Sequence, residues 1–176
     1  EYVEFTKKLT ESDYSKALNK LKPGDWVRLK MPNGAFTFEG EHKKIALLTG
    51  GIGITPFRSI CKFAKDRNLP ADIVLLYGSD TEEDIIFRED FDRMAKEYNN
   101  LRVIYTLTSP AVDGSTWKGK TGLIDGKMIK EEIPDFGERI FYYCGSPKIV
   151  QYLDHVLKAE LSVPDSRLMK ENFPGY

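Results

Sequence analysis

Two glycine-containing turns, about ninety residues apart, hold the residue types that could do chemistry. The first, Gly50-Gly51-Ile52-Gly53, follows the apolar run 45–48 and leads into Thr55 and Pro56. Glycines let a ligand approach the backbone closely, and the unpaired amides of a following helix start favour a phosphate. Thr55 is expected to be the N-cap of that helix and Pro56 its first residue, where a missing amide hydrogen costs nothing. The first turn therefore predicts a phosphate-binding site.

The second turn carries a thiol at the end of another apolar run, 140–143. Its residues are Cys144, Gly145, Ser146 and Pro147. Pro147 lies near the start of a further expected helix. Together the two turns predict one nucleotide cleft whose reactive end is lined by Cys144 and Thr55. Two plainer alternatives stay open: residues 50–53 could form an ordinary tight turn, and Cys144 could be an inert buried thiol.

The elements that must position these turns alternate between strand and helix after residue 42. Short apolar runs rich in branched and aromatic residues predict strands over 45–49, 73–77, 102–108, 139–144 and, near the end, 168–171. Apolar residues at helical spacing predict helices over 56–66, 86–98, 127–132 and 147–161. The alternation predicts an α/β fold, a five-stranded parallel sheet with helices on both faces. The only long loop is expected over 109–120.

The first 41 residues have a different, β-rich pattern. Strands are expected over 4–9, 26–30 and 36–38, and a short helix is expected over 14–21 after Ser12 and Asp13. These strands are too few to close a barrel alone. We therefore predict two units, residues 1–41 as a β-rich unit and residues 42–176 as the α/β domain. The chain starts at Glu1 without Met or a signal peptide, which is typical of a fragment or a processed chain.

Composition excludes several classes of function. The 26 basic and 27 acidic residues give a formal net charge of -1, which predicts no broad electrostatic footprint for nucleic acid or an anionic membrane. No apolar run approaches the roughly 20 residues of a membrane span. Two isolated cysteines, Cys61 and Cys144, and two distant histidines, His42 and His155, predict no metal site. Free thiols favour a cytoplasmic protein.

Three motifs in order carry a family resemblance. A strand followed by GGxGxTP, a second strand ending in Tyr-Gly-Ser at 77–79, and Tyr-x-Cys-Gly-x-Pro at 142–147 resemble the nicotinamide-dinucleotide domain of the ferredoxin-NADP reductase superfamily. The similarity runs from about Lys43 to Tyr176. Upstream, 13–15, 21–25 and 32–36 are similar to the last part of that family's flavin-binding barrel, which implies that residues 1–41 are part of an antiparallel β-barrel. The family's earlier Arg-x-Tyr-Ser/Thr flavin motif is absent from this chain.

The resemblance implies an oxidoreductase that transfers hydride from NAD(P)H to FAD and electrons onward. The acceptor would be a ferredoxin, another iron-sulfur or heme protein, or a small molecule. Around the dinucleotide it implies Gly50, Gly51, Gly53, Thr55, Pro56, Cys144, Gly145, Ser146 and Pro147, with Cys144 positioning the nicotinamide. Around the flavin it implies Tyr14 and Ser15, with Tyr176 over the ring and Phe173 as second candidate. Tyr176 could instead be a frayed terminus.

The choice between NADH and NADPH depends on groups near the adenosine ribose. A free ribose hydroxyl suits an acidic group, whereas a phosphate needs Arg or Lys. Ser79 and the acidic run from Asp80 to Asp84 follow the second strand, and no Arg follows Ser109, which favours NADH. Lys118, Lys120 and Arg88 are the residues that could bind a phosphate instead. The acidic run could also be only a solvated helix start.

Two other classes of function stay open. One is a regulatory or isolated module that holds NAD(P) without turnover, and the missing flavin motif is consistent with it. The other is a dehydrogenase with a Rossmann fingerprint, in which nicotinamide reacts directly with a carbonyl or alcohol. That fingerprint needs a third glycine where Pro56 stands, so its first requirement fails.

Overall fold

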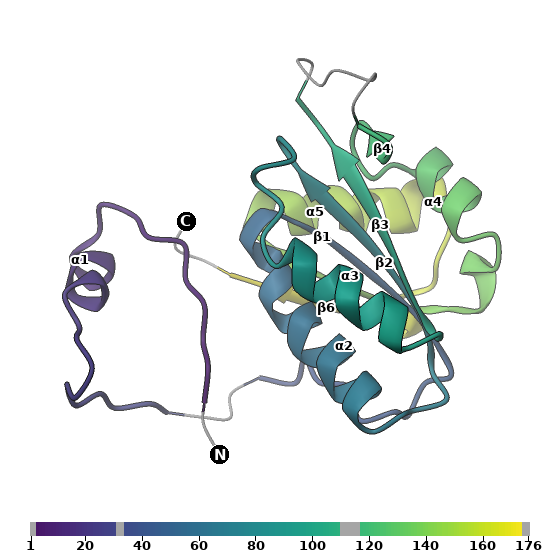
Figure 1. Ribbon diagram of the computed structural model, residues 1–176. Coiled ribbons are helices and arrows are strands. Elements are labelled where there is room, and N and C mark those ends of the chain that lie inside the picture. The colour runs from purple at the N-terminus through teal and green to yellow at the C-terminus, as the bar shows by residue number, and fades with distance from the viewer. Residues whose placement is uncertain (1–2, 31–33, 110–116, 174–176) are drawn as a thin grey trace.

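A parallel sheet of six strands forms the centre of the molecule (Figure 1). The computed structural model describes residues 3–30, 34–109 and 117–173. The strands are β1 (Lys44–Gly50), β2 (Asp72–Ser79), β3 (Leu101–Leu107), β4 (Lys120–Thr121), β5 (Ile140–Gly145) and β6 (Leu168–Asn172), in the spatial order β4-β3-β2-β1-β5-β6. The helices are α1 (Asp13–Asn19), α2 (Thr55–Asp66), α3 (Arg88–Glu97), α4 (Gly126–Glu132) and α5 (Pro147–His155). The predicted α/β class is confirmed.

Helices cover both faces of the sheet. In Figure 1, α2 and α3 lie in front of it and α4 and α5 lie behind it. Alternate residues of β1 serve the two cores: Ile45 and Leu47 pack under α2 and α3, while Ala46 and Leu48 pack under α4 and α5. All four side chains are fully buried, as expected for a central strand that is covered on both faces.

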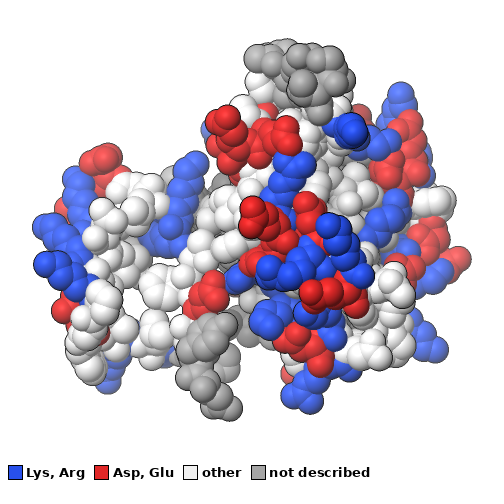
Figure 2. Space-filling model, viewed as in Figure 1, with Lys and Arg blue, Asp and Glu red and all other residues white. Residues whose placement is uncertain are grey.

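Charges on the outer face of α2 and α3 alternate in sign. Figure 2 shows Lys and Arg side chains interspersed with Asp and Glu over these helices. Two ion pairs link them, Arg58 to Asp90 at 2.6 Å and Lys65 to Glu97 at 2.6 Å. This face of the molecule therefore carries no broad patch of one charge.

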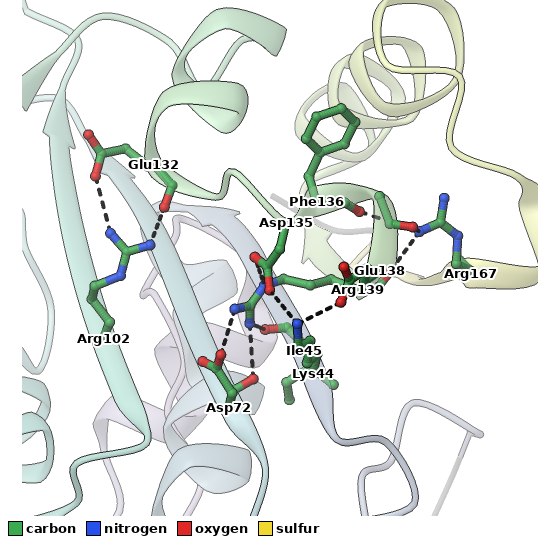
Figure 3. Close-up of polar contacts among 11 residues, drawn as sticks. Lys44, Ile45, Asp72, Arg102, Glu132, Asp135, Phe136, Glu138, Arg139 and Arg167 are labelled. Atoms are coloured by element: carbon green, nitrogen blue, oxygen red, sulfur yellow. Dashed lines mark hydrogen bonds and ion pairs between the residues drawn. The ribbon is translucent and has the colours of Figure 1, made fainter.

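At the amino ends of the strands, a buried arginine joins three of them (Figure 3). Arg139 precedes β5, and its guanidinium donates to the backbone oxygens of Ile45 and Asp72 at 3.1 Å each. It also pairs with the carboxylates of Asp72 and Asp135 at 2.7 Å each. Lys44 adds a second cation beside Asp135 at 3.0 Å. The cluster closes the end of the sheet opposite the two turns.

Three elements differ from the sequence predictions in the α/β part. The sheet has a sixth strand, β4, which begins at the last residue of the predicted long loop; it has only two residues, which is too short for a periodic pattern. Helix α3 begins at Arg88 because Phe87 adopts a left-handed backbone (φ 60°). The last helix changes after His155 into a π-helical turn, η3 (Val156–Glu160).

The expected strands of the first 41 residues are not formed. Before Lys44 the described residues contain α1 but no strand, because no segment there supplies the ladder of hydrogen bonds that a strand needs. This corrects the expectation of strands over 4–9, 26–30 and 36–38. Eight of the ten large apolar side chains that are exposed in the described residues lie in this part: Val3, Phe5, Leu9, Tyr14, Leu21, Trp26, Val27 and Leu29.

Candidate functional site

The two turns lie side by side at the carboxyl edge of the sheet. β1 and β5 are neighbours, and Thr49 is opposite Cys144 in register. The Thr49 hydroxyl donates to the Cys144 backbone oxygen at 2.8 Å. Ile149 of α5 packs against both turns, because a Cβ on Gly50 would lie 3.2 Å and one on Gly145 3.4 Å from its side chain. The chain moves from one half of the sheet to the other between these strands, which is the usual place for a ligand in such sheets.

Gly53 is the point of closest approach between the turns. It belongs to a 3-10 turn, η1 (Gly51–Ile54), that joins β1 to α2. A Cβ on Gly53 would lie 2.4 Å from Thr49 Oγ1, 2.7 Å from the Cys144 oxygen and 2.9 Å from Gly145 Cα. Only glycine fits this position without displacing backbone.

The Cys144 thiol lies beneath this turn and is fully buried. It donates to the Gly53 oxygen, with 3.1 Å between Sγ and O. Burial raises the pKa of the Cys144 thiol, and the carboxylate of Glu171, opposite it on β6, raises it further. The thiol is therefore protonated near neutral pH and holds the turn rather than acting as a nucleophile.

The two helix starts are built differently. Thr55 is not an N-cap: η1 runs directly into α2, the cap position is Ile54, and Thr55 is already helical. This corrects the N-cap expectation, while Pro56 does occupy the first turn of α2. At α5, Ser146 is the N-cap and its hydroxyl accepts from the Ile149 amide at 3.4 Å, with Pro147 as the first helical residue.

A cleft of about 630 Å³ opens beside the first turn. Its volume is in the range of small-molecule sites. The carboxyl ends of three strands line it with Thr49, Gly50, Gly51, Gly78, Ser79, Asp80, Thr106 and Thr108. Ile149 and Tyr152 of α5 line its other side; the helix predicted over 147–161 does not by itself indicate this contact.

Ser79 and Asp80 lie in the wall of this cleft. The Ser79 hydroxyl is buried and has no hydrogen-bond partner among the described residues, so it is available to a polar ligand. Asp80 is held in place because its carboxylate accepts from the Thr108 hydroxyl at 2.8 Å. A further carboxylate of the acidic run, Asp84, accepts from the Thr81 hydroxyl at 2.7 Å. These acidic groups are ordered by specific contacts.

A second cavity, of about 1030 Å³, lies on the other side of the glycine turn. Thr55, Pro56, Phe87 and Phe173 line it, together with residues 3–6, which we call the N-terminal arm. The Phe173 amide donates to the Gly145 oxygen at 2.9 Å, and Glu4 of the arm pairs with Arg58 at 2.7 Å. Aromatic walls suit a planar ring system. No sequence signal could place the arm or Phe87 here, because both depend on long-range packing.

Several predicted residues are not at either cavity. Tyr14 and Ser15 lie in α1, which Figure 1 shows apart from the sheet. The Tyr14 side chain is 62 % exposed, and Ser15 is bonded within its own segment, for example to Thr10 at 3.0 Å. Tyr176 lies outside the described residues.

The three candidate phosphate partners are placed at the edge of the sheet. Arg88 pairs with Glu82, and Lys120 pairs with Glu132. With Lys118 they line a third cavity, beside β3 and β4, and none of them lines the cleft of Asp80.

The described ranges hold neither a metal-binding cluster nor a helix that could span a membrane. No group of three or more His, Cys, Asp or Glu side chains there could hold a metal ion. No helix in that part of the chain has the length and apolar character needed to cross a bilayer.

Comparison with known proteins identifies the α/β part. NADH-cytochrome b5 reductase 1 of Aspergillus terreus is 33% identical over 149 residues, covering 80% of this chain and 49% of that protein. The human enzyme of the same name is 32% identical, covering 80% and 52%. The chain thus spans about half the length of these curated relatives.

Solved structures show the same fold. The FAD/NAD-binding domain of nitric oxide dioxygenase from Vibrio cholerae superposes with a TM-score of 0.76 at 25% identity, covering 93% of this chain and 67% of that one. The CS-b5R domains of human Ncb5or, in the NAD+ form, give a TM-score of 0.76 at 24% identity, covering 93% and 47%. Residues 47–155 match the family model described as "Oxidoreductase NAD-binding domain". The chain therefore belongs to the family of oxidoreductase NAD-binding domains.

Proposed function

We propose that this chain is the NADH-binding part of a flavin-linked oxidoreductase, in which hydride passes from NAD(P)H to FAD and electrons continue to an acceptor. The observation that carries the proposal is the junction of the two turns. Thr49, Gly53 and Cys144 lock the glycine turn and the thiol turn together at one edge, with a cleft on one side and an aromatic-walled cavity on the other. A dinucleotide lying across this junction would have its adenosine end in the cleft and its nicotinamide beside the cavity.

Each part of the site has a role in this proposal. The backbone amides of Gly51 to Ile54 bind the pyrophosphate, since they precede α2 and carry the positive end of its dipole. Cys144 orients that turn by donating to the Gly53 oxygen. Phe87 and Phe173 shield the nicotinamide and flavin from water. When bound, NADH would supply a hydride and FAD would accept it and release electrons singly, so the protein needs no general base.

The acidic wall supports NADH as the preferred coenzyme. Asp80, fixed by Thr108, would accept hydrogen bonds from free ribose hydroxyls and repel a 2'-phosphate. The curated relatives that carry NADH in their names agree with this choice. Arg88, Lys118 and Lys120 line another cavity, whereas Lys7 and Lys8 are the cations that line this cleft.

The acceptor and the compartment are part of the same proposal. Relatives and structural neighbours are named as reductases of cytochrome b5 and as ferredoxin reductases, so a heme or iron-sulfur protein is the proposed acceptor class. Cys61 and Cys144 are both free and buried, which supports a reducing, cytoplasmic setting.

Calorimetric titration of the chain tests the coenzyme part of the proposal. We expect NADH to bind, NADPH to bind more weakly, and Asp80→Asn to reduce the difference. Asp165→Asn, which alters an exposed carboxylate elsewhere, is the matched control. Absence of NADH binding by the native chain would overturn the proposal.

A second titration tests the flavin part. The chain is mixed with FAD without oxygen, and the flavin absorbance is followed as NADH is added. Bleaching that is slower in Cys144→Ala than in the native chain supports the enzyme. NADH binding without any flavin reduction would favour the other candidate, a module that holds NAD(P) without turnover.

A further inference from the structure

We infer that Arg88 is a positioning residue that fixes the adenosine wall of the coenzyme cleft without touching the coenzyme. The inference rests on the proposed function. It concerns the segment 80–88, which leaves β2 and ends at the first residue of α3. Glu83, Asp84 and Ile86 of this segment line the cleft, and Phe87 lines the second cavity. Whatever fixes the end of the segment therefore sets the position of both walls.

The Arg88 guanidinium lies near two aromatic rings. Its central carbon is 5.8 Å from the centre of the Tyr105 ring and 5.6 Å from that of Trp117. Tyr105 belongs to β3, and Trp117 precedes β4. A planar guanidinium can lie against such rings while its edge still donates hydrogen bonds, which an ammonium group cannot do.

The edge of the guanidinium reaches back to the acidic run. Arg88 pairs with Glu82, which lies in sequence between Asp80 and Glu83, two residues of the cleft wall. It also lies 3.9 Å from Asp92, and Asp92 accepts from the Tyr105 hydroxyl at 2.8 Å. The contacts form one closed group that joins the segment 80–88 to β3.

The Trp117 side of this group is closely packed. The Trp117 indole donates to the Lys120 oxygen at 2.7 Å. A Cβ on Gly119 would lie 2.2 Å from the Trp117 ring and 2.9 Å from the Tyr105 oxygen, so the backbone is packed directly against the indole. Arg88 thus connects the acidic segment to the β3–β4 edge of the sheet.

Binding of a 2'-phosphate by Arg88 is the competing role, and the structure argues against it. The guanidinium is already engaged by Glu82, Asp92 and two rings. It lines the cavity at the β3–β4 edge rather than the cleft that contains Asp80. Loss of a positioning residue should weaken binding of NADH, the coenzyme that uses the acidic wall, whereas loss of a phosphate ligand should weaken binding of NADPH.

The test compares calorimetric dissociation constants for NADH and NADPH in three variants of the full chain. For Arg88→Gln we expect the NADH constant to rise about tenfold and the NADPH constant to change by less than about threefold. Arg88→Lys keeps the charge but not the planar group beside the two rings, and its NADH constant should fall between those of Arg88→Gln and the native chain. Arg93→Gln is the matched control on α3, because Arg93 is 60 % exposed and pairs only with Asp90 among the residues described.

The outcomes separate the inference from a purely structural role. Equal weakening of both coenzymes, with a melting temperature lower than that of Arg93→Gln, would mean that Arg88 only stabilises the fold and would overturn the inference. So would unchanged NADH binding in Arg88→Gln, or selective loss of NADPH binding. If the native chain fails to bind NADH, the proposed function fails first and the inference falls with it.

Discussion

Gly53 shows how one residue ties the two halves of the site together. Its hydrogen atom occupies the space where a methyl group would meet Thr49, Cys144 and Gly145 at 2.9 Å or less. Two of these contacts are with backbone, which cannot rotate away. Glycine here is a requirement of packing, separate from any need for a positive φ.

We predict that Gly53→Ala lowers the free energy of unfolding by about 2–3 kcal/mol, the cost of forcing extra volume into a packed interior. Urea unfolding of the chain is the measurement. Gly137→Ala is the control, since nothing lies within 4 Å of a Cβ there, and it should change stability by less than about 0.5 kcal/mol. Equal stability of the two variants would contradict the packing argument.

A second prediction concerns the reactivity of the two thiols. Burial raises the pKa of both Cys61 and Cys144, so neither should react with a water-soluble thiol reagent in the folded chain at pH 8. In denaturant both should react. Labelling followed by mass spectrometry counts the modified residues, and rapid modification of native Cys144 would show that the turn above it opens readily.

At the scale of elements, the stability that the Arg139 cluster gives to the amino ends of the strands depends on pH. The Arg139 and Lys44 cations lower the pKa of Asp135 below its usual range. A carboxyl whose pKa is lower folded than unfolded, where it is about 3.9, stabilises the fold above that value and loses this contribution as pH falls through the folded pKa.

Asp135→Asn should therefore lower stability by about 1–2 kcal/mol at pH 7, less than for a fully buried pair because Asp135 remains partly exposed. The difference from the native chain should shrink between about pH 5 and pH 2 as the native carboxyl is protonated. Urea midpoints across this range check the prediction, with Asp165→Asn as the exposed control. A constant difference at all pH values would exclude the electrostatic cause.

The helices and strands also differ in how far the sequence predicts them. Five strands and four helices of the α/β part were predicted because each has an apolar pattern that depends on its own residues, as in 45–49 and 147–161. β4 was missed because two residues carry no pattern; its position depends on the Trp117 indole and its contact with Lys120. At the site, the glycine and thiol turns were predictable, whereas the N-terminal arm and the Arg88 group arise only from long-range packing.

For the whole molecule, the boundary between the two predicted units is open to test. Phe38 is buried in the core under α2, and the Phe36 ring lies 5.5 Å from that of Tyr142. The Tyr142 hydroxyl donates to the Thr37 oxygen at 3.2 Å. Segment 34–41 thus packs as part of the α/β unit, although it precedes the predicted boundary at residue 42.

We predict that a chain starting at Gly34 is more stable than one starting at His42 by about 3–5 kcal/mol, the usual cost of losing a buried Phe. Removing residues 1–33 should cost less than about 1 kcal/mol, because the ion pair that its described residues make with the α/β part, Glu4 to Arg58, is an exposed one. Thermal and urea unfolding of both truncated chains decide the matter; equal stability would place the boundary at 42 after all.

The chain contains two tryptophans, one exposed to solvent and one buried. Trp26 is 82 % exposed in the first part, while Trp117 is 8 % exposed beside Arg88. Because indole fluoresces at shorter wavelength when it is removed from water, Trp117 should emit at shorter wavelength than Trp26. With Trp26→Phe the remaining signal would report on the edge of the sheet, and with Trp117→Phe it would report on any surface that comes to cover the exposed apolar segment.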